Sequence, residues 1–296
     1  MDNQGNEVRI NMINKLKLGS INICGLSNRS RMVINKYSDS EEFDALSIQE
    51  TGTSAMADLE LHNMHVISDS NNAANRGAAL YVSVKHTITK LDSISKISRH
   101  LDSCWGLVVA YKKRYIMGNI YIKLNHKSAI AETMKMLKAA EKEKERLKAS
   151  GIILMGDFNA RHHNWGDRQI NYYGRCLAES IDNCRYSICT SKSPTFLCSN
   201  GSSYIDLSTI SNELADSVIN CKTDEGVELF SGAPLRGHVP VVTLLNINRV
   251  DESVTITEKL DLTKMKWNEW TKHINDSIEE DRVHLETEEN PYTLWN

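Results

Sequence analysis

Residues 152–155, with the sequence Ile-Ile-Leu-Met, form a continuous apolar run that has the length of a strand. Such a run is typical of a strand that is buried on both faces of its sheet. Just upstream, residues 128–149 carry Ile130, Met134, Leu137 and Ala140 at three- and four-residue steps. This spacing predicts a helix with one buried face.

The rest of the chain up to residue 249 consists mainly of short strand-like segments. A second helix is predicted at residues 174–184, where Leu177, Ile181 and Cys184 share one face. Further strands are predicted at residues 16–23, 44–48, 78–84, 105–111, 114–122, 186–190, 204–208, 217–221 and 239–245. Many strands with few helices predict an α/β fold in which two packed, mostly antiparallel sheets are flanked by helices.

The charge of the 296-residue chain is unevenly distributed. Residues 250–296 contain 12 of the 38 acidic and 5 of the 35 basic residues, so they carry −7, whereas residues 1–249 carry +4. We therefore expect a polar N-terminal segment at 1–14, a folded domain at 15–249 and an acidic segment at 250–296. In the acidic segment, Trp267, Trp270, Ile274 and Ile278 predict an amphipathic helix near 263–279, which would dock on the main domain or on a partner.

The sequence also bears on the compartment. No apolar run approaches the roughly 18 residues that a membrane helix needs, and the polar start lacks the apolar core of a secretion signal. The seven cysteines are scattered and none forms a Cys-x-x-Cys pair, which favours reduced thiols. We expect a nuclear or cytoplasmic protein that is not secreted and has no membrane partner.

Five positions place polar side chains where predicted strands end or are interrupted. The strongest is Gly156-Asp157-Phe158-Asn159, which directly follows the apolar run; an Asx turn is its structural alternative. Gln49-Glu50 offers the hard oxygen ligands that Mg²⁺ accepts, unless it is only a solvated strand end. The remaining positions are Asn22, Asp206 and His238. A carboxylate such as Asp206 can fix the tautomer of a histidine such as His238, although a lone histidine is more often structural.

In this order along the chain, the five positions resemble the endonuclease/exonuclease/phosphatase superfamily, over about residues 15–247. The finer resemblance is to the endonuclease domain of non-LTR retrotransposons, especially insect-type elements. It rests on Ile48-Gln49-Glu50-Thr51, Asn75-Arg76-Gly77, residues 155–166, Ile205-Asp206-Leu207 and His238-Val239-Pro240-Val241. The resemblance implies a four-layered α/β sandwich that cleaves DNA at one edge. It also implies a reverse transcriptase domain in the full-length element, with residues 263–278 as the start of the connector.

The resemblance implies a metal site as well. Glu50 would hold Mg²⁺ or Mn²⁺, which polarises the scissile phosphate, and Asn22 would support the metal and its water shell. Asp157 would orient or deprotonate the attacking water.

Four further residues would act on the phosphate by the same resemblance. Asn159 and Tyr121 would steady it. His238 would donate to the charge that develops on its oxygens, with Asp206 behind the imidazole. The product would be a nicked strand with a 3′-hydroxyl.

One departure from the family's pattern concerns the metal. The family usually ends in Ser-Asp-His, whereas this chain has Arg236-Gly237-His238. The loss of a carboxylate beside a divalent cation predicts weaker metal binding. Three outcomes follow: activity persists at raised metal concentration, activity is lost, or a nearby acid such as Asp224 or Glu225 substitutes. We expect weak nicking of plasmid DNA that Gly237→Asp strengthens.

Basic side chains near these motifs are the candidates for DNA contact. They are Arg76, Arg161, His163, Arg175 and Arg236, with His162 and Arg168 beside them. Trp165 is expected in the core, with stacking on DNA as the alternative. Two other functions fit the same residues: a decayed or domesticated nucleic-acid-binding domain, and a phosphoesterase that acts on a small phosphorylated substrate.

Overall fold

The computed structural model describes residues 14–52, 56–69, 76–95, 101–123, 128–226 and 237–247. All of them belong to the unit Met1–Arg249. The predicted helix near 263–279 and the segment 1–13 lie outside the described residues. No helix within the described ranges combines the length and the apolar character that a membrane span requires.

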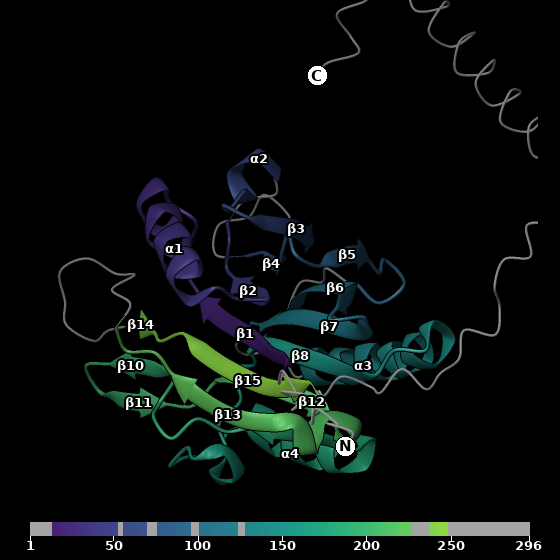
Figure 1. Ribbon diagram of the computed structural model, residues 1–296. Helices are drawn as coiled ribbons and strands as arrows, with labels where there is room; N and C mark the ends of the chain where they lie inside the picture. The colour runs from purple at the N-terminus through teal and green to yellow at the C-terminus, as the bar shows by residue number, and fades with distance from the viewer. Residues whose placement is uncertain are drawn as a thin grey trace, which may run out of the picture. The chain divides into compact units, whose positions relative to one another are not determined.

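Two six-stranded sheets form the centre of this unit (Figure 1). The first has the order β13 (Val218–Thr223), β15 (Val241–Ile247), β1 (Asn14–Asn22), β2 (Ala45–Gln49), β4 (Ala78–Ser83) and β3 (Met64–Asp69). The second has the order β5 (Thr87–Lys90), β6 (Leu101–Ala110), β7 (Lys113–Ile122), β8 (Gly151–Asp157), β12 (Asp206–Ser211) and β9 (Tyr186–Cys189). Only β1–β2 and β7–β8 pair in parallel, so the prediction of mostly antiparallel sheets is confirmed.

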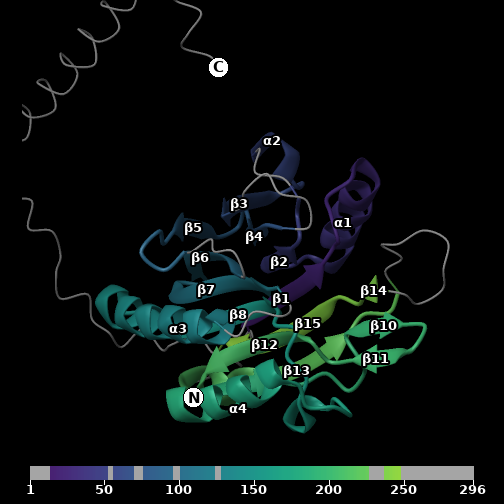
Figure 2. The same ribbon diagram turned by 180° about the vertical axis from the view of Figure 1, so that it is seen from behind.

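A third, small sheet and the helices complete the architecture. The small sheet has the order β11 (Gly201–Ser203), β10 (Phe196–Cys198) and β14 (Gly237–His238). The α-helices are α1 (Asn28–Glu41), α2 (Met56–Leu59), α3 (Ser128–Leu147) and α4 (Tyr172–Cys184), and single 3-10 turns span His163–Trp165 and Asn212–Ser217. Seen from behind, α3 and α4 lie on the side of the second sheet that faces away from α1 (Figure 2).

The apolar run at residues 152–155 explains the layering. Within β8, Ile152 and Leu154 pack with α3 and α4, whereas Ile153 and Met155 point to the other sheet and pack with residues of β1 and β15. Successive side chains of a strand alternate between its two faces, so an all-apolar strand joins two cores. A third core lies between α1 and the outer face of the first sheet. The predicted α/β sandwich with helices on both outer faces is confirmed.

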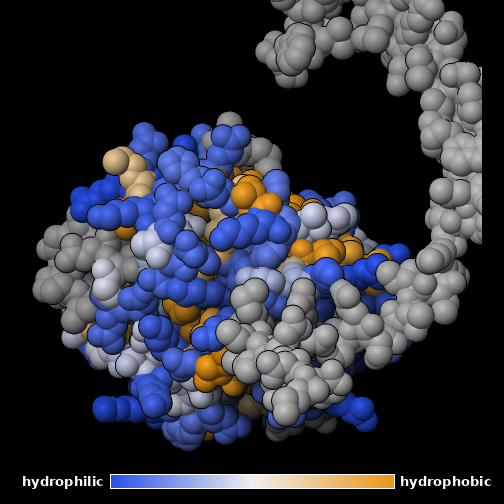
Figure 3. All heavy atoms as spheres, viewed as in Figure 1, coloured by the Kyte–Doolittle hydropathy of each residue, from blue (hydrophilic) through white to orange (hydrophobic). Residues whose placement is uncertain are grey.

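The surface agrees with this distribution of apolar residues. The face drawn in Figure 3 is mostly hydrophilic, with small apolar patches. The large apolar side chains that are exposed among the described residues come from separate elements; they are Met32, Val84, Tyr111, Ile170, Tyr172 and Ile219. Scattered single residues of this kind are normal on a protein surface.

Candidate active site

The strands carry the predicted residues to one edge of the sandwich. Asn22 and Gln49, the last residues of the parallel strands β1 and β2, are paired in register. In the second sheet, Asp157 at the end of β8 pairs with Tyr121 of β7 and with Asp206 at the start of β12. Parallel strands end at the same edge, so residues more than a hundred positions apart meet there.

Asn22 joins the two catalytic carboxylates. Its side-chain nitrogen lies 2.8 Å from Oε1 of Glu50 and 3.0 Å from Oδ2 of Asp157. Its side-chain oxygen accepts from the backbone N–H of Cys24 at 3.0 Å, which fixes the orientation of the amide. Asn22 therefore presents N–H groups to the acids, and its oxygen is engaged. The amide therefore holds the two carboxylates in place, and its oxygen is not available as a ligand.

His238 and Asp206 form the second half of the site. Nδ1 of His238 lies 2.9 and 3.0 Å from the two carboxylate oxygens of Asp206, and Nε2 lies 3.8 Å from Oδ2 of Asp157. The side chain of His238 is only 7% exposed. Burial on its own lowers the pKa of His238, but the charge of Asp206 and its hydrogen bond raise it to about 9. The imidazole is therefore protonated at neutral pH.

Asp157 lies in the most enclosed part of the site. Burial, together with the negative charge of Asp206, raises the pKa of Asp157 to about 7, although His238 and the hydrogen bonds from Asn159 and Asn22 oppose the shift. A carboxylate with a pKa near neutrality can accept and release a proton at physiological pH. The pKa of Tyr121 is raised by burial and by its hydrogen bond to Glu50, so its hydroxyl stays protonated.

Local backbone conformation aims three side chains at this edge. Cys24, Glu50 and Asn159 all have positive φ angles, of 49°, 54° and 47°. Positive φ is uncommon for residues other than glycine, and such strain is concentrated at functional sites. Asn159 is held by its side-chain nitrogen, which donates to the carbonyl of Ile122 at 2.8 Å, and its backbone N–H donates to Asp157 at 2.9 Å.

Gln49 does not belong to the metal site, contrary to the prediction. It is fully buried between the sheets, where its nitrogen donates to Asn119 at 2.7 Å and to the hydroxyls of Ser20 and Ser47. Alternation along β2 turns Gln49 to the interior, whereas the positive φ of Glu50 turns that carboxylate to the edge. Asn119, which sequence reasoning missed, also donates to the carbonyls of Ile48 and Ala79 and so ties β7 to β2 and β4.

The residues at this edge suit a hard divalent cation. Glu50 and Asp157 place carboxylate oxygens around one amide nitrogen, and oxygen is the ligand that Mg²⁺ and Mn²⁺ prefer. Asp157, Asp206 and His238 also bring one potential ligand atom each within 4.8 Å of one another. A protonated imidazole cannot ligate a metal, and Nδ1 is committed to Asp206. Glu50 and Asp157 are therefore the residues that could hold a divalent cation, with the imidazole of His238 beside them.

Comparison with known proteins agrees with this geometry. The sequence model of a family described as "Endonuclease-reverse transcriptase" matches residues 115–231, a segment that holds Tyr121, Asp157, Asn159 and Asp206. The endonuclease domain of TRAS1, a telomere-specific non-LTR retrotransposon, has a similar fold, with a TM-score of 0.63 and 14% identity over 80% of this chain and 100% of that chain. The family match covers less than half of the chain, and the structural similarity is one of fold.

Two further solved structures share the fold at a similar level of identity. An AP endonuclease from Leishmania major has a TM-score of 0.62 and 13% identity over 79% of this chain and 88% of that chain. A mannosyl-6-phosphatase from Bacteroides thetaiotaomicron has a TM-score of 0.58 and 17% identity over 78% and 99%. No curated protein matches the chain in sequence. Asn22, Glu50 and His238 lie outside the segment that the family model matches, so their assignment rests on the geometry above.

A cleft of about 620 Å³ opens over the candidate active site. Glu50, Tyr121, Asp157, Asn159 and His238 line it, as predicted candidates. Residues that sequence reasoning missed complete the wall; they are Lys123, Asn171, Phe196, Ser203 and Ile205. Phe196 packs against the imidazole of His238 with 4.8 Å between ring centroids. Most of these residues lie on the small sheet or on loops, where no periodicity marks them.

The basic residues predicted to contact DNA differ in their surroundings. Arg76 pairs with the buried carboxylate of Asp102 and its side chain is 12% exposed, so this ion pair accounts for it without DNA. His163 is exposed, with Nδ1 2.8 Å from the carbonyl of Asp167, and Arg175 is exposed on α4. Arg236 lies outside the described residues. Trp165 is buried and donates to the carbonyl of Ala160, which confirms the core interpretation.

Position 237, where the family pattern has an aspartate, has a backbone conformation that favours glycine. Gly237 has a φ of 119° and pairs with Leu197 in the small sheet. Asp224, the proposed substitute, accepts from the hydroxyl of Tyr37 at 3.1 Å and does not line the cleft. Neither it nor Glu225 replaces the lost carboxylate.

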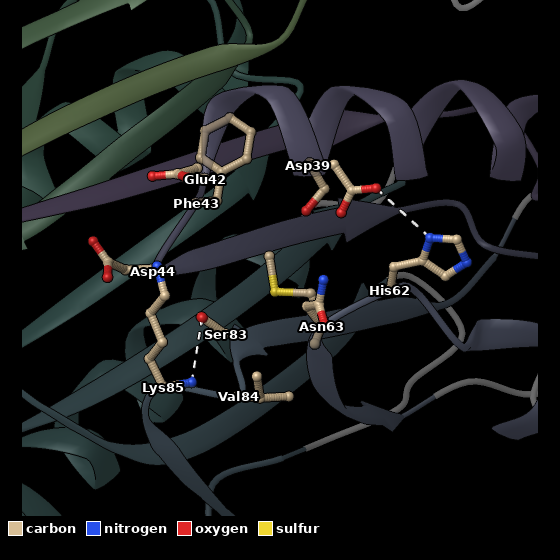
Figure 4. A pocket seen from close by; sticks show the side chains of 11 residues that line it. Asp39, Glu42, Phe43, Asp44, His62, Asn63, Ser83, Val84 and Lys85 are labelled. Atoms are coloured by element: carbon tan, nitrogen blue, oxygen red, sulfur yellow. Dashed lines mark hydrogen bonds and ion pairs between the residues drawn. The ribbon is translucent and has the colours of Figure 1, made fainter.

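A second pocket, of about 240 Å³, lies at the opposite edge of the first sheet (Figure 4). The register of β2 with β4 places Asp44 and Ser83 at the far end from Gln49. Its polar groups pair mostly with one another or with the core: His62 lies 3.6 Å from Asp39, and Asp44 bonds to His86 and Tyr111. None of the residues that line it belongs to the candidate active site.

Proposed function

We propose that the protein is a DNA endonuclease that requires Mg²⁺ or Mn²⁺ and cuts one strand to leave a 3′-hydroxyl. The observation that carries this proposal is the cleft in which Glu50 and Asp157, joined by Asn22, face the His238–Asp206 pair. DNA is favoured over other phosphate esters because the matching family is described as endonuclease-reverse transcriptase.

The residues divide the reaction between them. A divalent cation bound at Glu50 and Asp157 would polarise the phosphate and stabilise the leaving oxygen. Asp157 orients the water that attacks phosphorus and accepts its proton. The Nε2–H of His238 faces the cleft and donates to a phosphate oxygen as negative charge develops there. The bond from phosphorus to the 3′-oxygen breaks, and the 3′-alkoxide that leaves takes a proton from solvent water to become the hydroxyl.

The same proposal extends to a retroelement. A 3′-hydroxyl at a nick can prime DNA synthesis, and the family description joins the endonuclease to a reverse transcriptase. We place the nuclease in residues 15–249 and the start of a connector to such a domain in residues 250–296. The Gly237 departure suggests that the nuclease needs more metal than a member with the usual acid.

A plasmid assay tests the proposal. Supercoiled plasmid is incubated with the protein and Mg²⁺ or Mn²⁺, and nicked circles are extended by a DNA polymerase, which requires a 3′-hydroxyl. Glu50→Ala and His238→Ala should abolish nicking, whereas His62→Ala, at a histidine with a 72% exposed side chain, should not. Nicking that survives both active-site substitutions would refute the assigned site.

Two other functions are alternatives, and additional measurements in the same assay test each of them. Because the fold is shared with a mannosyl-6-phosphatase, small sugar phosphates are also tested as substrates, and the release of inorganic phosphate is measured. Gly237 favours a domain that binds nucleic acid without cutting it. Phosphate release without nicking would support the first, and DNA binding without either reaction would support the second.

A further inference from the structure

Besides the protonated imidazole of His238, the cleft contains two cationic side chains, and they differ in what already binds them. Lys123 and Arg161 both line it. A DNA phosphate that approaches Glu50 and Asp157 meets negative charge, so a cation beside them is needed to hold it. Which cation is available is therefore decisive for substrate binding.

Each of the three side-chain nitrogens of Arg161 already donates a hydrogen bond within the protein. Its Nε donates to both oxygens of the buried carboxylate of Asp167 at 3.1 and 3.0 Å, and one terminal nitrogen donates to Gln169 at 2.8 Å. The other terminal nitrogen donates to the carbonyl of Ser202 at 3.1 Å. Asp167 also accepts from the backbone N–H of Tyr204 at 3.0 Å. Arg161 thus braces the loop after β8 against the β10–β11 hairpin.

Within the described residues, the side chain of Lys123 has no such hydrogen bond or ion pair. It comes directly after β7, on the same face as Asn119 and Tyr121, because side chains of a strand alternate with a period of two. Along this face Asn119 is buried between the sheets, Tyr121 reaches the active site and Lys123 is exposed in the cleft. A two-residue step of extended chain carries the Cα atom of Lys123 about 6.6 Å beyond that of Tyr121.

We infer that Lys123 is the residue that anchors the DNA backbone in the cleft, and that Arg161 is a brace. This inference rests on the proposed function. Lysine binds phosphate as a compact point charge on a flexible stem, so it needs no rigid partner to orient it. Its place beside Tyr121 and Glu50 sets it next to the scissile phosphate or the phosphate that adjoins it. Lys123 therefore contributes to binding, with no proton transfer assigned to it.

The salt dependence of DNA binding tests the inference. Binding of a fluorescent duplex is measured by anisotropy in EDTA, so that no strand is cut, over a range of salt concentrations. Each phosphate contact contributes about −0.9 to the slope of log K against log salt for duplex DNA. Lys123→Gln should make the slope shallower by about that amount and weaken binding several-fold at low salt, and Lys123→Arg should restore it.

Two matched variants complete the design. Lys113→Gln makes the same charge change at the other end of β7, about 33 Å away, and should leave the slope unchanged. Arg161→Gln should lower the melting temperature and leave the slope unchanged, whereas Lys123→Gln should leave the melting temperature unchanged.

The outcomes separate the inference from the proposed function. Wild-type protein that binds and nicks DNA, with an unchanged slope in Lys123→Gln, would overturn the inference alone. An equal loss in Lys113→Gln, or a shallower slope in Arg161→Gln only, would also overturn it. Wild-type protein that neither binds nor nicks duplex DNA would refute the proposed function itself.

Discussion

Nδ1 of His238 lies 2.9 Å from Oδ1 of Asp206, although the two residues are 32 positions apart on different sheets. Asp206 begins β12 of the second sheet, and His238 ends the short β14 of the small sheet. The ion pair is almost completely buried and therefore links the stability of this edge to the protonation of one imidazole.

We expect the free energy of unfolding to fall as the pH rises from about 6.5 to 9.5. The pKa of folded His238 is about 9, above the ordinary value of about 6.5 that applies when the chain is unfolded. The stabilisation is complete below pH 6.5 and is lost as the pH passes 9; the shift corresponds to about 3 kcal/mol. Urea unfolding in EDTA measures it. His238→Gln should remove this part of the pH dependence and His62→Gln should not.

We expect Gly156→Ala to prevent stable folding. A methyl group at Gly156 would lie 1.9 Å from the carbonyl oxygen of Ile120, and the φ of 146° is itself unfavourable for alanine. We estimate a loss of more than about 4 kcal/mol, measured by thermal or urea unfolding. Gly201→Ala is the control, because Gly201 has a similar φ of 141° but nothing within 4 Å of the added carbon. An equal effect of both substitutions would show that strain, and not the contact, dominates.

We expect adjacent residues Gln49 and Glu50 to give opposite results. Gln49→Ala removes three buried hydrogen bonds and should lower the free energy of unfolding by about 2 kcal/mol without a change in metal affinity. Glu50→Gln should weaken Mn²⁺ binding at least about tenfold, because a carboxylate ligand becomes neutral. Electron paramagnetic resonance of free Mn²⁺ measures the affinity without reference to activity. Weaker Mn²⁺ binding in Gln49→Ala would restore Gln49 as a ligand.

We expect Gly237→Asp to lower the metal concentration needed for nicking and to destabilise the fold. The added carboxylate supplies the anionic group that the superfamily pattern has at this position. The positive φ of Gly237 imposes a strain of about 1–3 kcal/mol on any other residue. Metal titration of plasmid nicking and thermal unfolding measure the two effects. An unchanged metal requirement would show that the lost acid does not limit activity.

The sequence predicts the long-range frame of the fold better than its details. The α3 helix and β8 follow from strong apolar periodicity, and the predicted ends of β1, β2, β8 and β12 supply the site residues. The α1 helix escapes prediction because its buried face uses Ser30 and Ser38 beside Ile34 and Tyr37, which dilutes the apolar signal.

The site itself is only partly readable from sequence. Residue type identifies Glu50, Asp157 and His238, but not that Gln49 turns inward or that Arg161 is bound to Asp167. Those outcomes depend on backbone φ angles and on partners from distant loops, neither of which leaves a periodic pattern. Lys123 is found only through the cleft that it lines.

Asn22 has a consequence for how an ion would arrive. Two carboxylates that approach each other without a cation repel, yet one amide nitrogen holds Glu50 and Asp157 together in the metal-free fold. These two side chains are thus already in place in the metal-free fold, so we expect binding of an ion not to be coupled to folding as it is in zinc fingers. A chelator should therefore abolish activity without unfolding the protein. When the cation is added back, activity should return as fast as the ion diffuses to the site and loses its water, with no slow refolding phase.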